Sequence, residues 1–189
     1  MELTKEIAIK VKETVECGLS SGIGNRIPGE MCVEAAVCYA YDLPHGDNPP
    51  CVGSAVRSFK IKLNDSNWSS NKARGKGMLK ISISQLNSNV IDQREFSRRI
   101  IIKIVNHIIS SLAAKYAPEL EEKLKIVTEI SEIVTLCREL QQKVAAYAAA
   151  AYAKSFKKDE ILTKTADLCL EVLIEMKSPG CKYLYLLEK

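Results

Sequence analysis

The sequence predicts an all-α protein, a bundle-like packing of helices without a sheet. Apolar residues recur every three or four positions through most of the chain, the spacing that gives a helix one buried face. Residues 119–158 contain neither glycine nor proline, and strand-like alternation occurs only briefly, at Lys80–Ser84. We therefore expect a compact N-terminal helical part, residues 1–90, and a part with long antiparallel helices, residues 91–189, joined in one integrated domain.

The N-terminal part predicts four helices separated by loops rich in glycine or proline. Glycines open the loop Ser20–Gly29, and three prolines exclude regular structure from Leu43–Gly53. Ser69 or Ser70 can cap the fourth helix, although Gly75 and Gly77 weaken its first turns and make a loop an alternative there. The expected helices are Thr4–Glu16, Glu30–Tyr41, Ser54–Asn64 and Ser70–Leu86.

The C-terminal part predicts three further helices. The first opens at Asp92, which has a glutamate three residues later, and runs to Tyr116. Pro118 suits the first position of a second, very long helix that reaches Lys158. The third runs from Asp159 to Lys177, and the tail after it folds back on the body. The long helix carries a seam of apolar residues, Leu120, Leu124, Val127, Ile130, Val134, Cys137, Leu140, Val144, Tyr147 and Ala151, which predicts packing within the chain or across a dimer.

The cysteines and the N-terminus indicate a cytoplasmic protein. The seven cysteines are odd in number and include no CxxC pair, which favours a reducing compartment. With two histidines and no finger-like spacing, a structural zinc site is not expected, and we expect no cofactor. The N-terminus mixes both charge signs, unlike a signal peptide, and the longest lipid-compatible stretch, Ala145–Ala153, is too short to span a bilayer.

Basic residues concentrate in one segment, Arg57–Lys80. The net charge of the whole chain is only +4, but this segment holds seven basic side chains and one acidic one, Asp65. It also contains the single tryptophan, a dense set of serines and asparagines, and two glycines. Arginine and lysine supply charge, serine and asparagine supply hydrogen bonds, and glycine lets backbone amides approach, so the composition suits a phosphate. The alternative is a solvated basic face with a buried tryptophan.

A ligand site in this segment would combine charge, hydrogen bonding and stacking. We expect phosphates to contact basic side chains, polar edges to contact asparagines, and a base to stack on Trp68. The proline-rich loop would form the other side of the site. The predicted ligand-binding residues are His45, Asp47, Arg57, Lys60, Asn64, Trp68, Asn71 and Arg74.

The proline-rich loop offers a second, catalytic interpretation. His45 as base, Cys51 as nucleophile and Asp47 as orienting group would suit a hydrolase, as would a metal-bound water in place of the thiol. This hypothesis requires His45 and Cys51 to share one pocket. The alternative is a structural turn in which Asp47 bonds local backbone and Cys51 is buried.

The run PHGDNPPCVGSAVRSFKIKLNDSNWSSNKARGKGM, Pro44–Met78, resembles a block in a family of hypothetical proteins of bacteria, cyanobacteria included, and of phages. Those proteins follow it with an Ala-rich helix and a segment like MKSPGC, here Met176–Cys181. This chain departs from that pattern in its short Ala-rich stretch. The family has no established activity, so the resemblance assigns no catalytic residue. Its phage members imply one role, counteracting host defence by sequestering a nucleotide signal.

Three functions follow as hypotheses. The first is non-enzymatic binding of a small anionic ligand such as a nucleotide or cyclic nucleotide, with the long helices as a scaffold. The second is the hydrolase described above. The third is a protein–protein adaptor or oligomer that uses the seam Leu120–Ala151. Nucleic acid is a less favoured partner, which a steep dependence of binding on salt and length would reveal.

Overall fold

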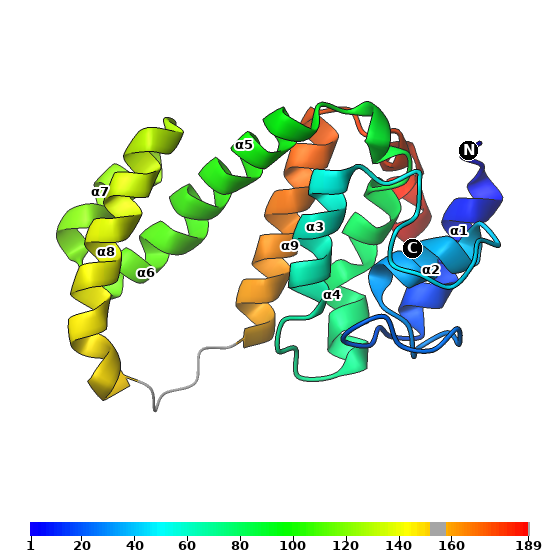
Figure 1. Ribbon diagram of the computed structural model, residues 1–189, viewed down its shortest axis with the longest axis horizontal. Coiled ribbons are helices and arrows are strands. Elements are labelled where there is room, and N and C mark those ends of the chain that lie inside the picture. Colours follow the sequence, from blue (N-terminus) through cyan, green and yellow to red (C-terminus); the bar gives the residue numbers. More distant parts are fainter. Residues whose placement is uncertain (152–157, 189) are drawn as a thin grey trace. The chain divides into compact units, whose positions relative to one another are not determined.

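The computed structural model describes residues 1–151 and 158–188, and for residues 144–151 and 158 it describes the backbone alone. Within these ranges the chain forms helices and no strand, which confirms the all-α prediction (Figure 1). The chain divides into two compact units, Met1–Ser97 with Lys158–Lys189, and Arg98–Lys157. This division differs from the boundary expected at residue 90, because the last helix packs against the N-terminal helices.

Local capping signals explain where the helices of the first unit begin. The Thr4 and Ser70 hydroxyls accept hydrogen bonds from backbone amides of the first turn, and so does the Cys32 thiol, which starts its helix later than expected. The helices of this unit are α1 (Lys5–Glu16), α2 (Val33–Ala40), α3 (Ser54–Asn64), α4 (Asn71–Ser84), the first residues of α5 (Gln93–Ile104), and α9 (Lys158–Glu175).

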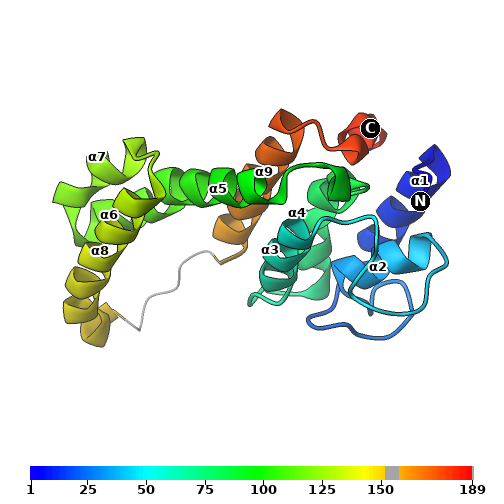
Figure 2. The ribbon, with the colours of Figure 1, turned by 45° about the horizontal axis from the view of Figure 1, so that its top comes forward.

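Helix α4 packs against both α1 and α9 (Figures 1 and 2). Its two glycines, which weaken a helix in isolation, permit these contacts. A Cβ on Gly75 would lie 2.5 Å from the backbone oxygen of Val15 in α1. A Cβ on Gly77 would overlap the Trp68 ring and approach Thr163 of α9. Helix α4 is continuous from Asn71 to Ser84, so the alternative of a loop around Gly75 and Gly77 is wrong.

Helices α4 and α9 run parallel although residues 85–157 separate them in the chain. At their starts, the Ser69 amide and hydroxyl both donate to the Asp159 carboxylate. Beyond their ends, the Gly180 amide donates to the Leu86 carbonyl, 2.9 Å away. After α9 a 3₁₀ segment, Pro179–Leu187, folds back as predicted, and its Tyr183 hydroxyl donates to the Leu3 carbonyl.

The second unit is a small helical bundle in which the predicted long helix is broken. After α5 come a π-helical turn (Val105–Ile109), α6 (Ser110–Tyr116), α7 (Pro118–Ile126) and α8 (Ile130–Ala151). Val127 is extended, with ψ of 135°. Because a single long helix cannot bury its apolar stripe against itself, the break lets both halves share one core. That core contains Val105, Ala113, Ala117, Leu120, Leu124, Val127, Ile133, Leu136 and Leu140.

Part of the predicted seam is therefore internal to this unit, whereas Ile130 and Val134 are 37% and 41% exposed. Leu120, Leu124, Val127 and Leu140 are buried in the core, which leaves these four side chains unavailable to a second molecule. The end of the seam, Val144, Tyr147 and Ala151, lies outside the described side chains, as does Tyr152. Among the described residues, no helix combines the length and apolar character needed to cross a bilayer.

Candidate functional site

Several residues of the basic segment hold the glycine-rich loop that follows α1. The buried Arg74 side chain, 6% exposed, donates from Nε to the Asn64 carbonyl and from a terminal nitrogen to the Leu19 carbonyl, each 2.7 Å away. The same nitrogen donates to Oδ1 of Asn71 at 2.9 Å. Because these acceptors are atoms of the protein itself, the guanidinium stabilises the fold. The prediction that Arg74 faces a ligand is therefore wrong.

The Asn64 side chain completes this brace. Its Nδ2 donates to the Ser20 carbonyl at 2.8 Å and to Oδ1 of Asp65, and its Oδ1 accepts from the Val33 amide at the start of α2. The Asp65 carboxylate in turn accepts from the Gly22 amide at 2.7 Å. Asn71 Nδ2 donates to Gly29. The polar block therefore fixes the loop Ser20–Gly29 through its backbone.

The loop itself can form only with glycine at its tightest point. Gly24 has a φ of +66°, and a Cβ there would collide with the Glu30 carbonyl. His45 Nε2 lies 2.9 Å from the Gly24 carbonyl, so the proline-rich loop also braces this turn. His45 and Asp47 are both exposed. Asp47 lies over a cavity of about 30 Å³, room for a water molecule and too small for a nucleotide.

Lys60 forms a buried ion pair that the sequence did not predict. Its Nζ lies 2.8 Å from Oε1 of Glu34, and both side chains are 0% exposed. Desolvation raises the pKa of the Glu34 carboxyl, against the attraction of Lys60 and of half-buried Arg57. The second carboxylate oxygen, Oε2, has no hydrogen-bond partner among the residues that the structure describes. Lys60 is therefore a core residue with no access to a solvent-borne ligand.

Trp68 is sealed inside the first unit and cannot stack on a base. Only 5% of its surface is exposed, and its Nε1 donates to the Leu63 carbonyl at 2.9 Å. Its ring lies under Gly77 of α4. The aromatic and charged residues of the segment thus do not converge on the common hollow that the sequence suggested.

The geometry gives no support to the hydrolase hypothesis. The Cys51 thiol is buried, and burial raises its pKa, whereas a nucleophile needs a lowered one. Its neighbours are the Tyr41 hydroxyl and the Asn87 amide. The His45 ring forms its hydrogen bond with the Gly24 carbonyl and not with the Cys51 thiol. Among the described residues there is also no group of three or more side chains placed to hold a metal ion.

A hollow lies between α4 and α9. It has a volume of about 760 Å³, within the range of small-ligand sites. Its lining residues recur at helical spacing on each of the two helices, so each helix contributes one face. They are Ala73, Lys76, Gly77 and Lys80 on α4, and Asp159, Glu160, Thr163, Lys164 and Asp167 on α9. We call this hollow the α4–α9 groove.

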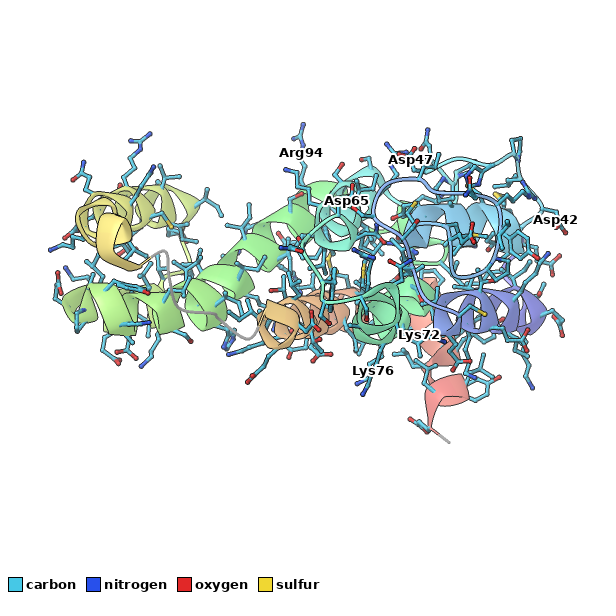
Figure 3. The ribbon with its side chains drawn as sticks, turned by 90° about the horizontal axis from the view of Figure 1, so that it is seen from below. Asp42, Asp47, Asp65, Lys72, Lys76 and Arg94 are labelled. Carbon is cyan, nitrogen blue, oxygen red and sulfur yellow. The ribbon has the colours of Figure 1, made fainter. Side chains whose placement is uncertain are left out.

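Two lysines of the groove belong to the basic segment and remain available. Lys76 and Lys80 are exposed and form no ion pair with a described residue. Figure 3 shows Lys76 projecting from α4. Opposite them, Asp159 is occupied by Ser69, whose hydrogen bonds hold the pKa of the Asp159 carboxyl below its usual value. Asp167 is exposed and, within the described residues, also unpaired.

Sequence reasoning missed the α9 half of the groove. Thr163, Lys164 and Asp167 occur in an ordinary amphipathic stretch, and nothing local links them to Lys76. The i, i+4 spacing of Lys72, Lys76 and Lys80 was a usable signal, since it places three cations on one face of a helix. A comparison of the chain with protein families, curated proteins and solved structures finds no match.

Proposed function

We propose that the protein is a non-enzymatic binding protein for a small anionic ligand of nucleotide size, and that the ligand binds in the α4–α9 groove. The observation that carries this proposal is that two unpaired lysines, Lys76 and Lys80, line one hollow of suitable volume. The ligand class is the one expected from the basic segment. The proposed site differs from the one predicted from the sequence. The side chains of four predicted ligand-binding residues instead contact other parts of the protein, namely Arg74, Asn64, Lys60 and Trp68.

The groove offers two kinds of contact to a phosphate. Lys76 and Lys80 stand one helical turn apart, so both ammonium groups can approach one anion or two adjacent ones. Thr163 supplies a hydroxyl from the facing helix. Between the two lysines, Gly77 leaves room for the Trp68 ring and brings Thr163 close to α4. These contacts serve to hold an anion, and we propose sequestration or sensing as their role.

Isothermal titration calorimetry with pyrophosphate, ATP and 3′,5′-cyclic AMP tests the proposal. We expect at least one probe to bind the wild type, and the double variant Lys76→Gln/Lys80→Gln to weaken its binding about tenfold or more. The matched control is Arg57→Gln/Lys62→Gln, which removes the same charge from the same segment at positions outside the groove.

Two results would count against the proposal. If none of the three probes binds, the groove is not a site for this ligand class. If both double variants weaken binding equally, the effect is one of net charge and the groove is not the site. A steep loss of affinity with salt, and affinity rising with oligonucleotide length, would indicate a nucleic-acid backbone as the ligand.

A further inference from the structure

The α4–α9 groove presents opposite charges on its two walls. The α4 wall carries Lys76 and Lys80, and the α9 wall carries three carboxylates and one cation, Lys164. Asp159 is held by Ser69, and Glu160 and Lys164 have interactions of their own. The unpaired charges within the described part of the groove are therefore Lys76, Lys80 and Asp167.

This arrangement creates a conflict for a free phosphate. A polyanion drawn to the lysines would come near the Asp167 carboxylate on the facing helix, and two like charges a few ångströms apart repel even in water. A divalent cation between the carboxylate and the phosphate turns that repulsion into attraction. Mg²⁺ suits this position, since it typically binds through one or two carboxylates together with phosphate oxygens and retains several waters.

We infer that the groove takes its phosphate ligand as the Mg²⁺ complex, with Asp167 on the side of the ion and Lys76 and Lys80 on the side of the phosphate. This inference rests on the proposed function and narrows its ligand to di- or triphosphates, which bind Mg²⁺ in solution. Because no group of three or more metal-binding side chains occurs among the described residues, the ion depends on phosphate oxygens and water for most of its ligands. Mg²⁺ alone does not bind measurably.

Calorimetric titration of pyrophosphate, with EDTA or with a millimolar excess of Mg²⁺, tests this. For the wild type we expect Mg²⁺ to tighten binding about tenfold. In Asp167→Asn the Mg²⁺ enhancement disappears, and metal-free pyrophosphate binds about fivefold more tightly than it binds the wild type, because the repulsion is gone. The matched control is Asp47→Asn, another exposed and unpaired carboxylate that does not line the groove, and it keeps the wild-type response.

The outcomes separate the inference from the function on which it rests. If pyrophosphate binds without metal, depends on Lys76 and Lys80, and gains nothing from Mg²⁺, the inference fails and the proposed function stands. If Asp167→Asn retains the enhancement, Asp167 does not face the ion and the inference is overturned. If pyrophosphate binds under neither condition, the inference fails, and ATP and cyclic AMP alone then decide the proposed function.

Discussion

The Nε of Arg74 donates to the backbone carbonyl of Asn64, 2.7 Å away, and this contact joins the first turn of α4 to the end of α3. A terminal nitrogen of the same guanidinium reaches the Leu19 carbonyl, at the beginning of the glycine-rich loop. One side chain of α4 therefore links its own helix to the end of α3 and to the start of the loop after α1. A cation that the sequence placed beside a ligand is in fact bound to the chain.

Replacing Arg74 by alanine should destabilise the protein by about 3 kcal/mol, because two buried carbonyls lose charged donors. Arg74→Lys should recover only part of this loss, since an ammonium group cannot reproduce the geometry of the fork. Urea unfolding followed by circular dichroism measures both. Lys76→Ala, an exposed change on the same helix, is the control and should stay within about 0.5 kcal/mol of the wild type. An equally small effect of Arg74→Ala would contradict the assigned role.

The buried pair between Glu34 and Lys60 predicts a strong energetic coupling. Removing either partner alone, as in Glu34→Leu or Lys60→Met, leaves one uncompensated charge in the core and should cost about 3–5 kcal/mol. The double variant should recover most of that cost, because apolar groups of similar size pack well in place of the pair. A double-mutant cycle from denaturant unfolding gives the coupling free energy. Additive single effects would mean that the two residues do not interact.

The seven cysteines should react with iodoacetamide in an order set by burial. Cys17 is exposed and should be alkylated first at pH 8 in the folded protein. Burial raises the pKa of Cys38 to about 11 and that of Cys169 to about 12. A raised thiol pKa lowers the thiolate population at a given pH, so that about one Cys38 in a thousand is reactive at pH 8. Its rate should increase as the pH rises toward 11. Peptide mass spectrometry identifies the sites, and early labelling of Cys38 at pH 8 would refute the ordering.

Features governed by neighbouring residues could be predicted from the sequence. The cap at Ser70 and the start at Pro118 depend on residues within one turn, and the structure confirms them. The break at Val127 could not be predicted, since neither glycine nor proline marks it. It arises because Leu120 and Leu136 bury in one core, and that contact is tertiary.

The candidate site shows the same limit. Arginine and asparagine suit a phosphate and a backbone carbonyl equally well, because both present oxygen acceptors. Composition alone therefore could not tell that Asn64 and Arg74 bind the chain itself. The basic segment did contain Lys76 and Lys80, which line the groove. Their counterpart, Asp167, belongs to a helix that becomes a neighbour only after folding.

The parallel pairing of α4 with α9 also sets an order of events during synthesis. A ribosome releases α4 long before α9, and the whole of residues 98–157 emerges between them. Until α9 arrives, the nascent chain exposes the side of α4 around Gly77 and Trp68 that α9 later contacts. Chains truncated before residue 158 should therefore be unable to close the first unit, and are candidates for capture by chaperones.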